Sequence, residues 1–436
     1  MKKIIALLLV LVMSLGLIAC GQAPESAPAP EAAPEAAPEA APEAAPEAAP
    51  EAAPEAPEAI TLKVWGPAED QADENSFLPV ACAKFAEAHP EYEITWVFEV
   101  CAEGDAGNMV TKDPSAAGDV YMFANDQLGT LLQANAIARL GGAALDQVIA
   151  DNSETMVASV TSGEGVYGVP FTGNTWFMYY DKSVYTEEDI KSLDAMMAKK
   201  PVGFEVTNTW YLPAFYFAAG GTMFGEDGID GAAGVQFGGE AGAAATTYVA
   251  EALAAGLMIE GGGGAGLDAM RNGTIGAMFS GTWDAKNYQD ALGENYAAAQ
   301  LPCITLNGQE CQLRSFSGSK AFAANPNSAN LKAATALAAW LGSAEMQDLH
   351  YDLRNGEVVP CATSLLANEK FAQNPAAVAQ NDTIANTSKL QPSIPEMGTY
   401  WGNADPMGKA LVNGEVTAEN AAEMTETWNA GLNGGL

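Results

Sequence analysis

Basic residues are scarce in this chain of 436 residues, which carries 19 Lys plus Arg against 55 Asp plus Glu and a formal net charge of -36. Proteins bind nucleic acid largely by neutralising its phosphates with Lys and Arg, so this balance excludes a nucleic-acid partner. The acidic excess is not confined to one tail, because residues 60–436 keep 46 acids against 17 bases. The part of the chain with enough apolar residues to fold is therefore itself acidic.

Histidine and cysteine, which build most structural metal sites, are also sparse. The two histidines, His89 and His350, lie far apart in the sequence, and no Cys-x-x-Cys spacing occurs. We therefore expect neither a metal site nor a cofactor.

Five cysteines follow Cys20 in the sequence, so they cannot all pair with one another. Cys303 and Cys311 flank an Asn-Gly turn whose register places Cys303 opposite Gln312, which excludes a bridge between them. Cys82 lies in the opening part of a predicted helix and Cys101 ends the next predicted strand. In a right-handed β-α-β unit the start of the helix and the end of the following strand meet, so the sequence leaves open a disulfide or two free thiols.

Only one run of residues is long and apolar enough to suggest a membrane-inserting segment, residues 4–19, and it follows two lysines. This run is short, as in a targeting segment. Its end, Leu17 to Cys20, resembles the lipobox of bacterial lipoproteins; an ordinary secretory signal is the alternative. We expect a signal peptide at 1–19 and a lipidated Cys20 that anchors an extracytoplasmic protein to the cell membrane.

Residues 20–59 form a segment with no aromatic residue, ten prolines and a repeated Glu-Ala-Ala-Pro unit. Such a composition cannot bury a core, and frequent proline prevents a continuous helix. We expect an extended linker between the anchor and the folded part.

The pattern changes at residue 60, where strand-like and helix-like segments begin to alternate. Strands are expected at 60–65, 92–100 and 120–123, and helices at 77–88 and 128–138. Extended segments at 167–170 and 176–180, a helix opening at 186–189, and helices at 240–256, 329–342 and 415–430 follow. This order predicts an α/β fold, and its length predicts two lobes.

Several segments of the chain, in their order and spacing, resemble the solute-binding proteins of ABC sugar importers, most closely the maltose/maltodextrin-binding branch. The matching segments are 62–71, 118–129, 167–170, 180–182, 281–283, 301–302 and 394–401. The resemblance implies a periplasmic-binding-protein-like fold, with hinged lobes and a ligand cleft between them. It places the N-terminal lobe at 60–172 and 316–343, and the C-terminal lobe at 173–315 and 344–436.

The same resemblance implies a function, in which a monomer binds an α-glucan oligosaccharide and delivers it to ABC permease subunits. Independently of the family, five tryptophans lie near predicted element ends, beside turn residues, where loops meet a cleft: Trp65, Trp176, Trp210, Trp283 and Trp401. Sugars suit such surfaces, because their C–H faces stack on aromatic rings while their hydroxyl groups bond to carboxylates and amides.

The candidate ligand-binding residues combine aromatic rings with carboxylate and amide groups. They are Glu69, Asp70, Phe123, Asn125, Asp126, Gln127, Asn174, Trp176, Trp210, Tyr211, Trp283, Tyr400 and Trp401. Capping of a following helix is the alternative role for Glu69, Asp70 and Asp126.

Four positions depart from the best-known members of the family. Asn174 replaces a glutamate, Gln127 and Asp405 replace arginines, and Gly402 replaces an aromatic residue. Changes in the polar residues of the cleft alter which sugar hydroxyl groups the protein recognises, so the identity of the glycan stays open.

Three alternatives to an α-glucan-binding protein stay open: a binding protein for another oligosaccharide, a binding protein for a polyamine, and a glycoside hydrolase. A binding protein for another oligosaccharide or for a polyamine would use the same rings and acids. A cell-surface glycoside hydrolase would need a carboxylate pair, which no motif in the sequence singles out. We expect a binding protein rather than an enzyme.

Overall fold

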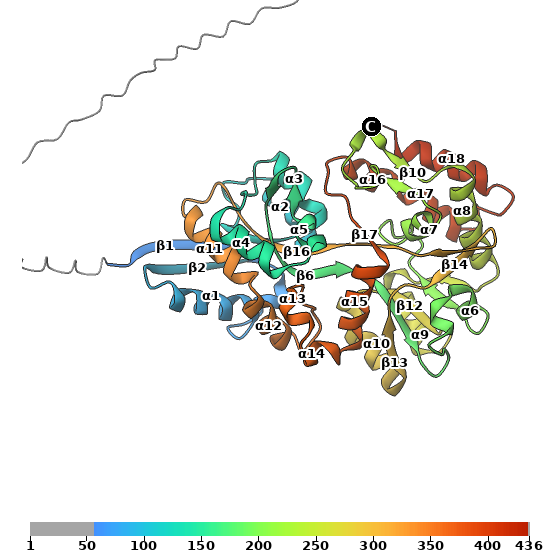
Figure 1. Cartoon of the computed structure of the whole chain (residues 1–436), viewed down its shortest axis with the longest axis horizontal. Helices are drawn as coiled ribbons and strands as arrows, with labels where there is room; N and C mark the ends of the chain where they lie inside the picture. The colour runs from blue at the N-terminus through green and yellow to red at the C-terminus, as the bar shows by residue number, and fades with distance from the viewer. Residues whose placement is uncertain (1–55, 435–436) are drawn as a thin grey trace, which may run out of the picture. The chain divides into compact units, whose positions relative to one another are not determined.

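The computed structural model describes residues 56–434, and the predicted signal peptide, Cys20 and most of the linker lie outside them. Among the described residues, none of the helices has the length and apolar character needed to cross a bilayer. Figure 1 shows these residues as two lobes of mixed helix and sheet, joined by strands that cross from one lobe to the other.

The N-terminal lobe is built on a sheet of order β17-β16-β3-β1-β2, with β6 on the other edge of β16. Its strands are β1 (Glu58–Gly66), β2 (Tyr92–Val100), β3 (Val120–Ala124), β6 (Val169–Thr175), β16 (Ser315–Ala324) and β17 (Ser388–Leu390). The predicted parallel β-α-β unit is confirmed, because β1 pairs with both β2 and β3 in parallel.

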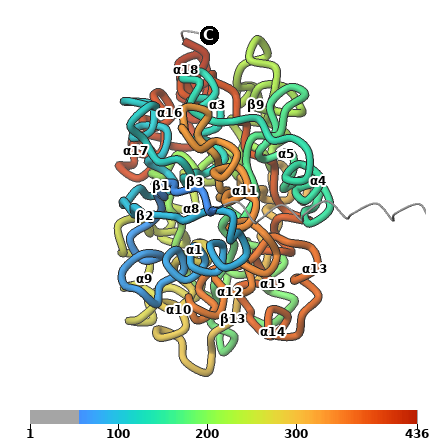
Figure 2. The backbone as a smooth tube through the Cα atoms, turned by 90° about the vertical axis from the view of Figure 1, so that its left-hand side faces the viewer, coloured from blue at the N-terminus to red at the C-terminus, as the bar shows by residue number. Residues whose placement is uncertain are grey.

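Helices cover both faces of this sheet. One face packs against α1 (Phe77–Ala88), α4 (Gly142–Asp151) and α11 (Leu331–Leu341), which lie beside one another in Figure 2. The other face packs against α2 (Ala106–Val110) and α3 (Leu128–Gln133). Alternate residues of β1 divide accordingly, since Val64 faces the first group of helices and Trp65 the second.

The C-terminal lobe has its own sheet, of order β11-β8-β12-β7-β13. The strands are β7 (Phe177–Asp181), β8 (Val202–Phe204), β11 (Met258–Glu260), β12 (Ala277–Ser280) and β13 (Tyr296–Ala299). The helices of this half are α6 (Leu193–Met197), α7 (Pro213–Ala218), α8 (Gly239–Ala254), α9 (Ala265–Arg271), α10 (Ala285–Leu292), α16 (Met397–Asn403), α17 (Asp405–Val412) and α18 (Ala421–Leu432). A large aromatic core, which includes Trp176, Phe279 and Trp428, fills the lobe.

The crossing back to the C-terminal lobe lies further along the chain than residue 343. Helix α12 (Ala344–Leu353) packs on α1 and α11, and Met346 belongs to the core of the N-terminal lobe. Two short helices, α13 (Thr363–Leu366) and α14 (Glu369–Ala372), continue from it. Helix α15 (Pro375–Asn386) then contacts β6 as well as β7 and β13. The predicted boundary at 344 is therefore too early.

The cysteines of the described chain are all free thiols. Cys82 is buried in the core on one face of the first sheet, whereas Cys101 follows β2 and is buried with Trp65 on the other face. Because the sheet lies between them, the disulfide left open by the sequence does not form. The hairpin of β14 (Cys303–Leu306) and β15 (Gln309–Gln312) has the predicted register, with Cys303 opposite Gln312.

Candidate ligand-binding cleft

A cavity of about 390 Å³, which we call the Trp401 chamber, lies between the two lobes. The N-terminal lobe contributes Asp126 and Glu103, and the C-terminal lobe contributes Trp210 and Trp401. The crossing strands supply Asn174 from β6 and Lys320 from β16. The chamber therefore presents two indole rings to acids, an amide and a cation.

A second cavity of about 170 Å³, the Arg354 chamber, continues the first. Its N-terminal wall includes Glu69 and Arg354, and its C-terminal wall includes Thr282 and Trp283. Both chambers are lined by Glu103 and Lys320, whose side chains form an ion pair at 3.1 Å. The two chambers meet at this pair and form one cleft.

Two tryptophan rings join the chambers on the side of the C-terminal lobe. Trp210 lines the first chamber and Trp283 the second, with ring centroids 5.9 Å apart and planes inclined by 39°. The side chain of Trp283 is 47% exposed, an unusual amount for an indole, whereas Trp210 is partly buried. Together they form a bent aromatic surface along one side of the cleft.

The position of Trp210 is fixed by a turn and by two hydrogen bonds. The Asn208 side chain accepts from the backbone N–H of Trp210 at 2.9 Å, in an Asx turn that precedes α7. The indole Nε1–H donates to Oε1 of Gln391 at 2.6 Å. The ring is thereby held in place before any ligand arrives.

Asp126 lies on a 3₁₀ turn, η3 (Asn125–Gln127), at the end of β3. It caps no helix; its Oδ2 accepts a hydrogen bond of 2.7 Å from Nε2 of Gln127. Burial raises the pKa of Asp126 to about 6, against the opposing effect of the Gln127 bond. The carboxylate is ionised at neutral pH and faces the Trp401 chamber, while Gln127 orients it.

Asp70 has a supporting role that the sequence did not predict. It is only 1% exposed and accepts hydrogen bonds of 2.9 Å from Nε2 of His350 and Nη1 of Arg354, both on or directly after α12. Burial opposes ionisation, yet the His350 and Arg354 groups together lower the pKa of Asp70 below its usual value. Its oxygen is thus occupied within the protein, whereas Glu69, beside it, is exposed at the cleft.

Five of the predicted contact residues are buried, which corrects the expectation that they touch a ligand. Each is at most 2% exposed, and none lines either chamber: Phe123, Asn125, Trp176, Tyr211 and Tyr400. Trp65 is buried as well. Asn125 packs so closely on the crossing strand that a Cβ at Gly318 would lie 2.1 Å from its Oδ1, which explains the glycine there.

Three of the buried aromatic residues support Trp210 from beneath. Tyr211 stacks on Trp176 at 4.7 Å and meets Trp210 edge-on at 5.7 Å. The hydroxyl of Tyr400 donates to the carbonyl of Thr209, in the turn that carries Trp210. These rings position the cleft surface without being part of it.

The lining residues that could not be predicted from the sequence include Glu103, Lys320, Gln391 and Arg354. Glu103, Lys320 and Arg354 lie outside every segment that resembles the family, so the resemblance could not point to them. Gln391 lies three residues before the matched segment 394–401, which offered the only nearby signal.

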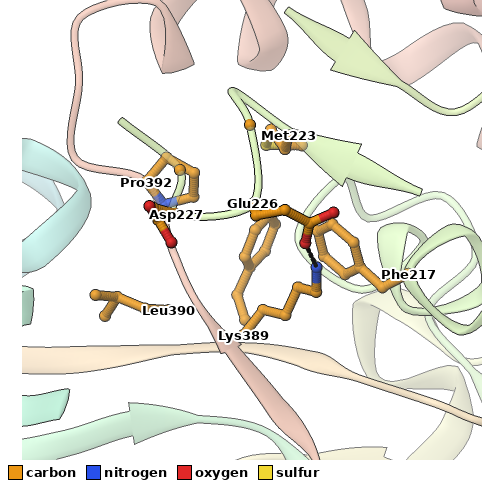
Figure 3. Close-up of a pocket in the computed structure, with 10 residues that line it drawn as sticks. Phe217, Met223, Glu226, Asp227, Lys389, Leu390 and Pro392 are labelled. Atoms are coloured by element: carbon orange, nitrogen blue, oxygen red, sulfur yellow. Dashed lines mark ion pairs between the residues drawn. The ribbon is translucent and has the colours of Figure 1, made fainter. Parts of the chain in front are cut away.

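A further pocket, which we call the Lys389 pocket, lies beside the cleft and is shown in Figure 3. It has a volume of about 230 Å³, and Nζ of Lys389 lies 3.8 Å from Glu226 and 5.6 Å from the ring centre of Phe217. Leu390 and Pro392 line this pocket, whereas Gln391 lines the Trp401 chamber. The segment 389–392 is therefore a wall of both.

Within residues 56–434, no group of three or more His, Cys, Asp or Glu side chains is arranged to hold a metal ion. The chemistry of the cleft is that of paired charges, amides and indole rings.

Comparisons with known proteins find the same fold in solved structures. A solved structure with acarbose is 46% identical and covers 86% of this chain and 99% of its own, with a TM-score of 0.81. The maltodextrin binding protein MalE1 from L. casei BL23, solved without ligand, is 26% identical with the same coverage and a TM-score of 0.78. The galactooligosaccharide-binding protein of Bacillus subtilis (strain 168) is 24% identical over 71% of this chain and 76% of its own length.

The family described as bacterial extracellular solute-binding protein matches residues 81–380, which is more than half of the chain. The match covers the whole second sheet, the first sheet apart from β1 and β17, and most of the residues that line the two chambers. The two-lobed α/β fold predicted from the sequence is confirmed by the solved relatives. The chain belongs to the bacterial extracellular solute-binding proteins.

Proposed function

We propose that this protein captures α-glucan oligosaccharides of the maltodextrin type in the interlobe cleft and delivers them to an ABC importer. One observation carries the proposal: the bent Trp210–Trp283 surface faces Asp126, Asn174 and Glu103 across a gap between two lobes. Two relatives, one solved with acarbose and one named for maltodextrin, support the choice of ligand.

The chemistry of the cleft suits a linear sugar. Exposed indole faces gain roughly 25 cal/mol for each Å² of apolar sugar surface removed from water. Hydrogen bonds from sugar hydroxyl groups to ionised carboxylates add about 1.5–3 kcal/mol each. Trp210, Trp283 and Trp401 would stack on the rings, while Asp126, Glu69 and Asn174 would accept from the hydroxyl groups.

Capture requires that the two lobes close on the ligand. A sugar that touches both lobes stabilises the closed arrangement only through the contacts it gains there. Trp210 on one lobe and Asp126 on the other line the same chamber, so one ligand can reach both.

A sugar-binding function is favoured over glycoside hydrolysis. Glycoside hydrolysis needs one carboxyl group as proton donor and a second, charged one as nucleophile or base. In this cleft Glu103 is paired with Lys320, and Asp70 and Glu69 with Arg354. Asp126, with a pKa of about 6, is ionised at neutral pH and so does not serve as the proton donor. Incubation with maltotetraose should yield no shorter product, as judged by chromatography.

A polyamine is disfavoured because most of the acids that line the cleft already have a cationic partner within the protein. Glu103 is paired with Lys320, and Asp70, Glu69 and Glu357 each lie within 3.8 Å of Arg354. Spermidine should therefore give no binding heat under conditions in which maltotetraose does.

The proposal is tested by calorimetry on the Cys20→Ala chain, which cannot be acylated at that residue. Maltotriose, maltotetraose and acarbose are expected to bind, and β-linked galactooligosaccharides to bind at least tenfold more weakly. Binding of the galactooligosaccharides alone would instead assign the ligand named for the Bacillus subtilis relative.

The anchor is a separate part of the proposal. Family membership places the protein outside the cytoplasm. The lipobox-like residues before Cys20 favour attachment to the membrane through acyl chains on that cysteine, and the Pro-rich linker would hold the lobes away from the surface. The Cys20→Ala chain is expected to lose incorporation of labelled palmitate and to leave the membrane fraction.

A further inference from the structure

We infer that the cleft extends beyond Trp283 into a third chamber that binds the additional glucose units of longer α-glucans. This Gln289 chamber has a volume of about 440 Å³ and lies between α10 of the C-terminal lobe and the loops at 355–357 and 373–375. The inference rests on the proposed function and adds a preference for chain length to it.

The two walls of the Arg354 chamber lead directly into the Gln289 chamber. On the side of the C-terminal lobe, Thr282 and Trp283 line the former, and Ala285 and Lys286, which begin α10, line the latter. On the other side, Glu357 lines both chambers. A chain that stacks on Trp283 can therefore continue in the same direction.

The part of α10 that lines the Gln289 chamber is long enough to contact one further sugar ring. Ala285, Lys286 and Gln289 lie on one face of α10, because residues three and four apart are neighbours on a helix. From Ala285 to Gln289 the helix axis advances by about 6 Å at ~1.5 Å per residue, which is about the length of one sugar ring.

The polar groups of the Gln289 chamber are available to a ligand. Among the described residues, the side-chain hydrogen bonds of this lining are made by Lys286, Gln373 and Asn374, and none is made by the side chains of Gln289 and Asn355 or by the Tyr296 hydroxyl. Lys286, by contrast, is paired with Asp290. Two amides and a phenol supply both donors and acceptors, as a rim of sugar hydroxyl groups requires.

The charge of this chamber also fits a neutral ligand. Its one lining acid, Glu357, has Arg354 at 3.8 Å, and its one lining cation is neutralised by Asp290. A neutral glycan can therefore enter without an unpaired charge being desolvated, which would be costly.

The test measures dissociation constants for maltotriose and maltoheptaose with the Cys20→Ala chain and with its Gln289→Ala, Asn355→Gly double variant. Glycine is chosen because Asn355 has a φ of 51°, which glycine adopts without strain. The double variant is expected to bind maltoheptaose about tenfold more weakly and maltotriose with unchanged affinity.

Matched controls come from the exposed hairpin. Asn307 also has a φ of 51°, and Gln309 follows it closely; neither lines any chamber of the cleft. The Asn307→Gly, Gln309→Ala double variant should bind both sugars as the parent does.

The outcomes separate the two proposals. If the parent chain binds neither sugar, the proposed function is rejected, and the extension with it. If the parent binds both sugars, and the Gln289, Asn355 double variant either binds maltoheptaose as tightly as the parent or loses affinity for both sugars equally, the extension alone is rejected.

Discussion

Two exposed or partly exposed indole rings are the clearest recognition groups in the cleft. Trp283 is nearly half exposed beside the Arg354 chamber, and Trp401 is partly buried beside the other chamber, edge-on to Phe316. Neither side chain is fully buried, so we expect each to be replaceable at limited cost to folding.

We predict that Trp283→Ala and Trp401→Ala each weaken maltotetraose binding by at least tenfold, or about 1.4 kcal/mol, because each removes a stacking surface. Calorimetry measures the effect, and circular dichroism checks the fold. Trp283→Phe, which keeps a flat ring, should retain most of the affinity. Unchanged affinity in both alanine variants would show that the rings do not contact the sugar.

Asp126 gives the cleft a pH dependence. Its pKa is raised to about 6 by burial, so the carboxylate that accepts from a sugar hydroxyl is lost as the pH falls through this value. Between pH 7.5 and pH 5 we predict that affinity for maltotetraose falls by up to about tenfold, following the fraction of ionised Asp126. The other two charged groups that line this chamber, Glu103 and Lys320, are paired with each other.

The control for this prediction is Asp126→Asn. The amide cannot titrate, so the variant should bind more weakly at pH 7.5 and show a flat profile between pH 7.5 and pH 5. A parent profile that is flat, or an Asp126→Asn profile that still falls, would assign the dependence to another group.

Which aromatic residues face the cleft could not be predicted from local sequence. Trp176 and Trp283 each follow a threonine at or near the end of a strand, yet the first is fully buried and the second is nearly half exposed. The difference arises because Trp176 is stacked on Tyr211 and surrounded by Phe204 and Phe279, which come from distant parts of the chain.

Helix α12 connects the wall of the cleft to the core of the N-terminal lobe. His350 on this helix and Arg354, which directly follows it, both hydrogen-bond to the Asp70 carboxylate. The ring of His350 also packs on Phe77 and Phe171 in the core. Removing one partner from a buried ionic group costs about 3–5 kcal/mol, because the other charge is left uncompensated.

We therefore predict that Asp70→Asn lowers the free energy of unfolding by about 3 kcal/mol at pH 7, as measured by urea denaturation. The folded-state pKa of Asp70 is lowered, so its stabilisation is present above the usual carboxyl pKa and lost as the pH falls through the lowered value. The parent should lose stability below about pH 4 more steeply than the variant. Glu74→Gln, on an exposed neighbouring residue, is the control and should change little.

The regular elements were predicted best where one periodic pattern filled the whole segment. Helix α1 and strand β2 have the predicted bounds, because each alternates apolar and polar residues at its own period. The helix expected at 128–138 ends at Gln133, since Asn135 takes a left-handed conformation with a φ of 50°. At 186–189 the capping hydrogen bonds form between Thr186 and Asp189, but only a 3₁₀ turn follows.

The arrangement of the two lobes was implied by family segments rather than by composition. Those segments include the turn η3 and helix α16, which carry Asp126 and Trp401, so these two lining residues could be anticipated. Glu103, Lys320 and Arg354 could not, because ion pairs between residues more than 200 positions apart leave no local pattern. The lobe boundary was misplaced for the same reason, since α12 follows α11 back onto the first sheet.

The account depends most on a sugar lying between the lobes against the Trp210–Trp283 surface, and a crystal structure with maltotetraose tests this directly. We predict ligand density in contact with Trp283 and Trp210 on one side and with Asp126 on the other. Density confined to another surface, such as the Lys389 pocket, with the cleft filled only by solvent, would contradict the account.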